Sequence, residues 1–149
     1  MEPRASPLFA QPLAVWEREG LKAALGKAGL PADDVADAGL FFWRFERDDV
    51  PAGFGGLEIH GEDALLRSLV TLPPLRLRGI GRAMVARLET EARAHGARAI
   101  YLLTTDMAAF FTELGYAVCD RAAVPPAIAA TAQFAELCPA SATAMMKQI

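Results

Sequence analysis

The fold of this chain is indicated by one stretch near its middle, Leu69-Val70-Thr71-Leu72-Pro73-Pro74-Leu75-Arg76-Leu77-Arg78-Gly79-Ile80-Gly81-Arg82. The first part reads as the end of a strand, which the two prolines stop because proline has no N–H to donate to a strand ladder. The second part is rich in arginine and glycine and leads directly into an amphipathic helix. This order predicts an anion site, since the first N–H groups of a helix have no intrahelical partner.

The loop is suited to a large phosphorylated cofactor. Gly79 and Gly81 lack side chains, so a pyrophosphate can approach the main chain closely. Two other glycine-rich loops are excluded, because the dinucleotide fingerprint needs a third glycine where Met84 stands and the phosphate loop of nucleotide hydrolases needs Gly-Lys-Ser/Thr. The positive charge that can pair with phosphate oxygens comes from three arginines, Arg76, Arg78 and Arg82. From the loop sequence alone, the alternative to an anion site is an arginine-rich start of a helix that binds no ligand.

Outward from this loop, the chain reads as one mixed α/β domain. Apolar spacing predicts a helix over 13–28 and a helix from Ile80 that Gly96 ends, with exposed i, i+4 pairs of Arg87 with Glu91 and of Glu89 with Arg93. Antiparallel strands are expected at 40–45, 54–60 and 64–72, with an inner strand at 99–104 that runs parallel to the third. The elements expected after them are a short helix capped by Asp106 and ended by Gly115, a strand at 116–119, a helix from the prolines 125–126 to Leu137 and a strand at 141–147. Residues 1–12 are expected to form a proline-rich arm or a degraded edge strand, and residues 13–149 a single domain.

The composition argues against several classes of protein. The chain has 149 residues and a net charge of −3, with lysine and arginine scattered among acidic residues, so a nucleic-acid partner is not expected. It shows no signal peptide and no apolar run of roughly 20 residues, which predicts a cytoplasmic protein without a membrane partner. Cys119 and Cys138 lack zinc-ligand spacing, so they are expected to be reduced and no metal is predicted. The closing strands suit either a sheet within the chain or a homodimer.

Two motifs resemble those of GNAT acetyltransferases. The segment Leu69-Val70-Thr71-Leu72-Pro73 followed by Arg76-x-x-Gly79-x-Gly81 looks like their acetyl-CoA-binding motif, and Phe110-Phe111-Thr112-Glu113-Leu114-Gly115-Tyr116 looks like their second signature, in the right order. The likeness covers roughly residues 13 to 147. The segments 64–69, 101–105 and 137–142 are further similar to a GNAT subgroup associated with arsenic-resistance operons, itself similar to amino-acid N-acetyltransferases.

The resemblance implies a GNAT fold that binds acetyl-CoA as acyl donor. Strands 64–72 and 99–104 would splay apart around the pantetheine arm, which main-chain groups near Leu69 and Thr71 would bind, with an oxyanion donor near Val70. The pyrophosphate would lie on the loop residues Leu77, Arg78, Gly79, Ile80, Gly81 and Arg82, with Arg76 alongside. The implied reaction is direct attack of a small-molecule primary amine on the thioester.

The chain departs from the family at Phe111, where a tyrosine often serves as general acid. Three alternatives follow from the missing hydroxyl. Tyr101, Tyr116 or water protonates the leaving thiolate, the thiolate leaves without an acid, or the chain is a catalytically silent acyl-CoA-binding module. A thiol titrates near pH 8.5, so an acid is helpful rather than obligatory.

Candidates for the base and for substrate binding lie on neighbouring strands. The period of two places Glu58 and His60 on one face, and Glu58 is the first choice as base, with a solvated face or an ion pair with Arg67 as the alternative. Arg67 stands in an apolar run and needs a negative partner, either the carboxylate of an amino-acid-like acceptor or Glu58 or Glu62.

Two further candidates are Thr104 and Thr105, at the carboxyl end of the expected inner strand. Ligands collect at this end of strands in open α/β sheets, so both hydroxyls are expected to line the substrate site. Capping of the next helix explains them equally well.

Overall fold

A computed structural model of the protein describes residues 8–14, 17–29, 40–72, 79–137 and 141–149. Within these ranges the strands form one mixed sheet in the order β1-β2-β3-β4-β5-β7-β6. The strands are β1 (Phe9–Pro12), β2 (Leu40–Arg47), β3 (Val50–His60), β4 (Asp63–Thr71), β5 (Ala99–Thr104), β6 (Ala117–Val118) and β7 (Thr143–Gln148). The helices are α1 (Arg18–Lys27), α2 (Ile80–Ala94), α3 (Ala108–Glu113) and α4 (Pro126–Ala129), with a 3-10 turn at Arg121–Ala123 and a π-helical turn at Gln133–Leu137.

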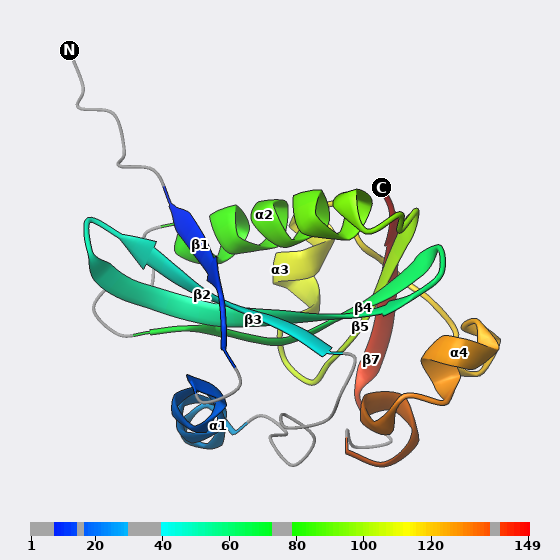
Figure 1. The fold of residues 1–149 in the computed structure, drawn as a ribbon. Helices are drawn as coiled ribbons and strands as arrows, with labels where there is room; N and C mark the ends of the chain where they lie inside the picture. Colours follow the sequence, from blue (N-terminus) through cyan, green and yellow to red (C-terminus); the bar gives the residue numbers. More distant parts are fainter. Residues whose placement is uncertain (1–7, 15–16, 30–39, 73–78, 138–140) are drawn as a thin grey trace.

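The helices cover the sheet from both sides. Figure 1 shows α2 over one face, with α1 and α4 under the other. On the α2 side, Met84 and Leu88 pack against Leu57, Leu66 and Ile100 in the main core. The opposite face carries two smaller cores, one beneath α1 around Phe42 and one beneath α4 around Leu65. Neighbouring residues Leu65 and Leu66 therefore belong to opposite faces, as the alternation of a strand requires.

β4 and β5 are the parallel pair of the sheet, and they separate part of the way along. Their register covers only Asp63–Leu65 against Ala99–Tyr101. Both strands continue beyond it, β4 to Thr71 and β5 to Thr104, while β5 keeps its antiparallel pairing with β7 throughout. The predicted mixed α/β fold with a parallel, splayed central pair is thus confirmed. The closing strands β6 and β7 pair with each other inside the chain.

A β-bulge marks the place where β4 turns away. The register of β3 with β4 passes from Gly56–Arg67 to Phe54–Val70, so Gly55 alone faces both Ser68 and Leu69. Ser68 has a φ of 58°, the left-handed conformation found at the first residue of a G1-type bulge. Gly55 is closely packed here, because a Cβ at this position would lie 2.7 Å from Leu88 Cδ1 and would force that buried side chain to shift. The bulge redirects β4 directly after Arg67.

Three expected elements differ in the structure. The first helix begins at Arg18 rather than at residue 13, since the Leu13 N–H still pairs with the Phe42 carbonyl at 2.8 Å and continues the sheet. Asp106 is not the cap of α3; the hydroxyl of Thr104 accepts from the Met107 N–H at 2.9 Å instead. The helix expected up to Leu137 is broken after Ala129, because the Thr131 hydroxyl bonds back to the Ile128 carbonyl at 2.7 Å and competes with helix continuation.

Other elements lie where they were predicted but differ in their bounds. β2 and β3 are longer than expected, and of residues 1–12, expected as a proline-rich arm or a degraded edge strand, Phe9–Pro12 forms strand β1. The cysteine Cys138 lies outside the described residues.

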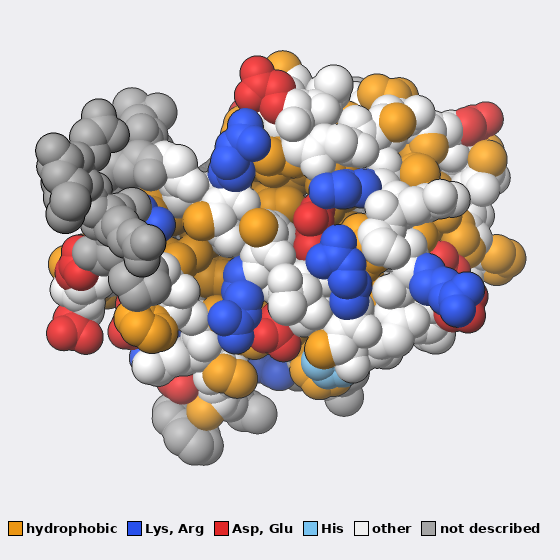
Figure 2. Space-filling model, turned by 90° about the horizontal axis from the view of Figure 1, so that it is seen from above, with side chains coloured by type: hydrophobic (Ala, Val, Ile, Leu, Met, Phe, Trp, Pro, Cys, Tyr) orange, Lys and Arg blue, Asp and Glu red, His pale blue; other side chains and the backbone are white. Residues whose placement is uncertain are grey.

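The surface over α2 carries mixed charges. Figure 2 shows lysine and arginine side chains in separate positions across this face, with acidic and apolar groups between them. In the described ranges, no helix is both long and apolar enough to cross a membrane.

Candidate active site

The separation of β4 and β5 opens a cleft of about 810 Å³ between them. Residues of both sheet faces line it, because the gap passes between two strands rather than over one of them. From the α2 face come Leu66, Ile80, Leu102 and Phe111, and from the opposite face come Leu65 and Leu103. The cleft therefore connects the amino terminus of α2 with the side of the sheet on which α1 and α4 lie.

Most of the predicted site residues lie on this cleft. Its lining includes Arg67, Leu69, Thr71, Gly79, Ile80, Gly81, Arg82, Thr104, Thr105 and Phe111. The Val70 side chain instead packs in the core beneath α1, which leaves its main chain as the part able to serve the site. Arg76, Leu77 and Arg78 lie outside the described residues, so their predicted role with phosphate stays a prediction.

The amino terminus of α2 is open toward solvent at its first glycine. Gly79 is the N-cap with a φ of 71°, and a Cβ built on it meets no atom of the described residues within 4 Å. The first turn of α2 contains no acidic residue of its own that would oppose an anion at the positive end of the helix dipole. Arg82 adds an exposed cation, 3.9 Å from the Glu113 carboxylate. This end of the cleft has the charge and the open main chain that a phosphate needs.

Gly81 serves a different purpose from Gly79. A Cβ at Gly81 would lie 3.2 Å from the ring of Phe110 and 3.8 Å from Thr71 Cγ2. The second glycine therefore allows α2, α3 and the end of β4 to approach one another at the mouth of the cleft. The sequence had suggested only that both glycines clear space for a ligand.

Glu58 and His60 share one face of β3, as expected. His60 Nε2 lies 3.0 Å from Glu58 Oε1, and both side chains are partly shielded. In the register, Glu58 faces Leu65, whereas Arg67 faces Gly56 two positions away on the same face. Neither Glu58 nor His60 is among the described residues that line the cleft, although Leu65 and Arg67 beside them are. The role of Glu58 as base stays a prediction.

Arg67 is buried on the cleft wall, with 4% of its surface exposed. Its Nε donates to Ser68 Oγ at 3.1 Å, and its guanidinium lies over the Phe42 ring, 5.5 Å from the centroid. The two acidic partners weighed for it have other contacts, since Glu58 bonds His60 and Glu62 lies 3.8 Å from Arg98. The bulge residue Ser68 thus orients a buried cation toward the cleft.

The two tyrosines weighed as general acids are placed elsewhere. Tyr101 packs on the α4 side near Cys119, and burial, reinforced by Asp63, raises its pKa. Tyr116 is buried in the main core, where its hydroxyl donates to Glu89 Oε2 at 3.0 Å. Neither belongs to the described lining of the cleft. Phe111, 5% exposed, presents an apolar ring to the cleft where a hydroxyl had been expected in the family.

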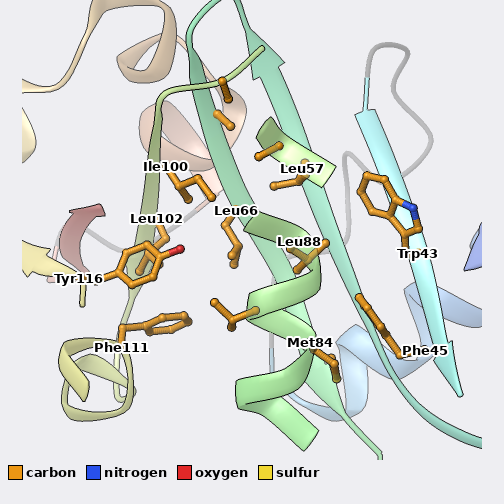
Figure 3. Packing of buried hydrophobic residues seen from close by; sticks show 14 of the residues in the cluster. Trp43, Phe45, Leu57, Leu66, Met84, Leu88, Ile100, Leu102, Phe111 and Tyr116 are labelled. Carbon is orange, nitrogen blue, oxygen red and sulfur yellow. The ribbon is translucent and has the colours of Figure 1, made fainter. Parts of the chain in front are cut away.

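Tyr116 belongs to a buried ionic network behind Phe111. Figure 3 shows the two rings next to each other, and their centroids lie 5.5 Å apart with the planes edge-on. The Lys147 ammonium donates to both carboxylate oxygens of Glu89, at 3.1 and 3.0 Å, and to the Leu114 carbonyl at 2.9 Å. The prediction that Glu89 forms an exposed pair with Arg93 is wrong, because Glu89 is only 7% exposed and points into this network. The other expected pair, Arg87 with Glu91, is confirmed at 3.1 Å.

The network predicts an alkaline dependence of stability. Burial, together with the Glu89 carboxylate, raises the pKa of Tyr116 far above its usual value. Below about pH 10 the tyrosine is protonated in both states and adds no slope; above it only the unfolded state loses the proton, so unfolding becomes easier by about 1.4 kcal/mol per pH unit. In Tyr116→Phe this slope is absent. Urea unfolding of both proteins between pH 8 and 11 should show the stability gap narrowing above pH 10, and a constant gap contradicts the assignment.

Sequence reasoning missed several residues of the cleft. Ser68, Asp106, Met107, Phe110, Glu113 and Gln133 all line it. A signal existed for Phe110, which belongs to the second GNAT-like motif, and for Gln133, a polar residue within an apolar stretch. The bulge at Ser68 leaves no trace in the strand pattern, because a single added residue in β4 is invisible without its partner strand.

Comparison with known proteins agrees with this geometry. The model of the acetyltransferase (GNAT) family matches residues 8–116. Over 52 residues, the chain is 44% identical to N-alpha-acetyltransferase 80 of Mus musculus, a stretch that covers 35% of this chain and 17% of that protein.

Solved structures show the same fold. N-acetylglutamate synthase from Neisseria gonorrhoeae, complexed with coenzyme A and N-acetyl-glutamate, superposes with a TM-score of 0.77 at 14% identity, covering 97% of this chain and 36% of that one. Rv2747 from Mycobacterium tuberculosis, in complex with CoA, gives a TM-score of 0.71 at 18% identity and covers 95% of this chain and 99% of that one. The chain thus spans about a third of the Neisseria synthase and less than a fifth of the mouse protein. The chain belongs to the acetyltransferase (GNAT) family.

Proposed function

We propose that this chain transfers an acetyl group from acetyl-CoA to the primary amine of a small, amino-acid-like molecule. The observation that carries the proposal is the cleft itself. It joins an open helix amino terminus, suited to phosphate, with a buried arginine on the other side of the sheet, suited to a carboxylate. Two ligands of different chemistry can therefore meet between β4 and β5.

The residues at the α2 end fit the cofactor. Gly79, Ile80 and Gly81 would offer main-chain N–H groups to the pyrophosphate, and Arg82 a charge-assisted hydrogen bond. The edges of β4 and β5 that face each other across the cleft would bind the pantetheine arm through Leu69 and Thr71. When bound, acetyl-CoA supplies a thioester that an amine can attack. The new C–N bond forms as the C–S bond breaks, with the amine proton passing to a base.

The acceptor side is proposed from Arg67 and the threonines. The guanidinium would bind the acceptor carboxylate, with the Thr105 hydroxyl nearby and Thr104 already committed to the Met107 N–H. The complex of the Neisseria synthase with N-acetyl-glutamate supports an amino acid as the acceptor class. The segments similar to the arsenic-resistance subgroup justify the inclusion of arsenic-containing amines among the acceptors to be tested.

Phe111 supports a second candidate, an acyl-CoA-binding module without transferase activity. With Phe111 apolar and both tyrosines away from the described lining, no side-chain phenol reaches the cleft from these three positions. We favour catalysis, since a thiolate is a tolerable leaving group near neutral pH and water can protonate it.

One experiment separates the two candidates. Calorimetry measures acetyl-CoA binding, and a thiol-release assay then follows CoA production with amines, amino acids and arsenic-containing amines. Binding with acceptor-dependent thiol release is the expected result. Binding without release for every acceptor favours the silent module, and absence of acetyl-CoA binding overturns both.

Glu58 is proposed as the base, and its removal gives a testable outcome. In Glu58→Gln, turnover at neutral pH should fall roughly 100-fold, the size expected for general base catalysis, while acetyl-CoA affinity stays unchanged. The loss should lessen at high pH, where more of the amine is already deprotonated. His60→Gln is the matched variant, because it removes the partner of Glu58 and leaves the carboxylate. Equal turnover of Glu58→Gln and the native protein would return Glu58 to a structural role.

A further inference from the structure

Ser68 brings a hydroxyl group to the place where β4 leaves β5. The parallel register of the two strands ends at Leu65, and Ser68, which is half-buried, lines the cleft just beyond that point. At the other end of the same edge, Thr71 lies beside the amino terminus of α2, since a Cβ on Gly81 would lie 3.8 Å from Thr71 Cγ2. Ser68 is therefore about 10 Å along the strand from Thr71. It stands at the closed end of the cleft, where the two strands meet.

One hydrogen bond orients the Ser68 hydroxyl. Its oxygen accepts from Arg67 Nε at 3.1 Å. With a donor on the oxygen, the hydroxyl proton points away from the guanidinium. Among the residues that the structure describes, none accepts a hydrogen bond from this hydroxyl. Ser68 therefore keeps one hydrogen-bond donor for a ligand in the cleft.

The backbone at Ser68 suits glycine better than serine. Its φ of 58° lies in the left-handed region, where a side chain is unfavourable and glycine is at ease. Residues held in this conformation cluster at active sites and ligand-binding sites. The presence of a side chain here points to a function for its hydroxyl.

The other hydroxyls and acids of the described lining are less suited to the closed end. The acidic groups, Asp106 and Glu113, are carboxylates, which accept hydrogen bonds but do not donate them near neutral pH. Phe111 has no hydroxyl. The remaining hydroxyls lie beside the amino terminus of α2, in the cap of α3 and at the exposed carboxyl end of β5, and belong to Thr71, Thr104 and Thr105.

We propose, resting on the acetyl transfer proposed above, that Ser68 is a catalytic residue whose hydroxyl donates a hydrogen bond to the leaving sulfur of acetyl-CoA. The groups proposed to hold the donor lead from Gly79 past Thr71 and Leu69 to Ser68, which brings the thioester to the closed end. There the hydroxyl meets the sulfur that has no phenol to protonate it, because Phe111 stands where the family often has tyrosine.

The hydrogen bond acts without transfer of the serine proton. As the amine nitrogen forms the new C–N bond, the electron pair of the C–S bond passes to sulfur, and the charge that develops there strengthens the hydrogen bond. Ser68 keeps its proton, because an alcohol is a weaker acid than a thiol. The amine proton passes to the base, and water protonates the thiolate after it leaves.

Ser68→Gly tests this role, because glycine removes the hydroxyl and suits the φ of 58°. Thiol release is measured in a single turnover, which separates chemistry from product release. The rate at saturating acceptor should fall roughly 10- to 100-fold, while the affinity for acetyl-CoA and the KM for the acceptor stay unchanged. Ser68→Ala should lose the same rate although alanine fits the backbone less well. Equal rates in two variants of different thermal stability assign the loss to the hydroxyl.

A titration of bound coenzyme A gives a second readout without turnover. Coenzyme A is the thiol product, and a hydrogen bond from Ser68 favours its charged form. The pKa of the bound thiol, followed by the ultraviolet absorbance of the thiolate, should be roughly one unit lower in the native protein than in Ser68→Gly. The same pKa in both proteins overturns the hydrogen bond.

Asp49→Gly is the matched control. Asp49 has a φ of 61° in the exposed turn between β2 and β3 and does not belong to the described lining of the cleft. This variant receives glycine at the same type of backbone position and should transfer acetyl at the native rate.

The contrary outcomes are separable. A native rate in Ser68→Gly overturns the catalytic role and leaves acetyl transfer standing. A native rate at saturation with a raised acceptor KM also overturns it, since Ser68 would then only hold Arg67. If Ser68→Gly does not fold, Ser68→Ala decides by the same measurements. Absence of thiol release from the native protein with every amine overturns the transferase function, and this inference with it.

Discussion

Replacing the two glycines at the entry of α2 together, as Gly79→Ala with Gly81→Ala, is expected to weaken acetyl-CoA binding roughly 100-fold. A loss of this size corresponds to one or two hydrogen bonds to a charged phosphate. A methyl group at Gly79 would project from the helix amino terminus into space that no described residue fills, where the phosphate is proposed to bind. A methyl group at Gly81 would displace Phe110 at the mouth of the cleft, since the built Cβ lies 3.2 Å from its ring.

The double variant should remain folded, so the loss can be assigned to binding. Alanine at the left-handed Gly79 costs about 1 to 2 kcal/mol. Alanine for glycine at Gly81, inside the first turn, returns up to about 1 kcal/mol through helix propensity. Thermal unfolding checks this balance.

Gly96→Ala is the matched control at the opposite end of α2. Gly96 also has a positive φ, 89°, and open space around a built Cβ, but it lies away from the cleft. It should lose similar stability and bind acetyl-CoA as the native protein does. Calorimetry measures acetyl-CoA affinity for the native protein, the double variant and Gly96→Ala. Native affinity in the double variant would contradict the proposed phosphate site.

The part of the fold around the entry of α2 was predictable because its determinants are local. The glycines that mark unusual backbone conformations and the apolar face of α2 are both visible as sequence patterns. The parallel neighbour of β4 followed from the continuous apolar run of β5, since a strand covered on both faces must be apolar throughout. The splay of β4 and β5 came only from the resemblance to GNAT proteins, because no residue pattern states how far two strands stay paired.

The features that escaped prediction depend on contacts distant in sequence. Glu89 was expected on an exposed face because the residue four positions on is the oppositely charged Arg93. Its true partner, Lys147, lies 58 residues away on β7. The bulge at Ser68 is defined by Gly55 on another strand, and the π turn at Gln133 by the hydroxyl of Thr131. Apolar residues that recur every 2 or 3.6 positions reveal the buried face of a strand or helix. They do not reveal which charged residue will pair with an opposite charge on a distant strand.

The ion pair that Glu89 forms with Lys147, instead of the predicted pair with Arg93, carries the second large expected effect, which is on stability. Lys147→Met is expected to lower the free energy of unfolding by about 3 kcal/mol, the usual cost of leaving one partner of a buried ion pair behind. The Glu89 carboxylate would keep the Tyr116 hydroxyl but lose both bonds to the ammonium. Leu114 would also lose the bond to its carbonyl. Urea unfolding at pH 7 measures the change.

Arg87→Met is the matched control on the same helix. It breaks an ion pair of similar length, Arg87 with Glu91 at 3.1 Å, but on the exposed face of α2. Exposed i, i+4 pairs contribute only about 0.3 to 0.5 kcal/mol, so the two variants should differ severalfold. Equal costs would mean that Glu89 is hydrated in solution and that the network is no more than a surface pair.

A double variant separates the charge pair from the packing around it. Adding Glu89→Gln to Lys147→Met removes the uncompensated carboxylate while the Tyr116 hydroxyl keeps an oxygen to which it can donate. Part of the lost stability should therefore return, which a sum of two independent losses would not do. Because Tyr116 supports the ring of Phe111 and donates its N–H to the Phe111 carbonyl at 3.0 Å, turnover should recover in parallel with stability. Recovery of stability without recovery of turnover would show that the network holds the fold but does not position Phe111 at the cleft.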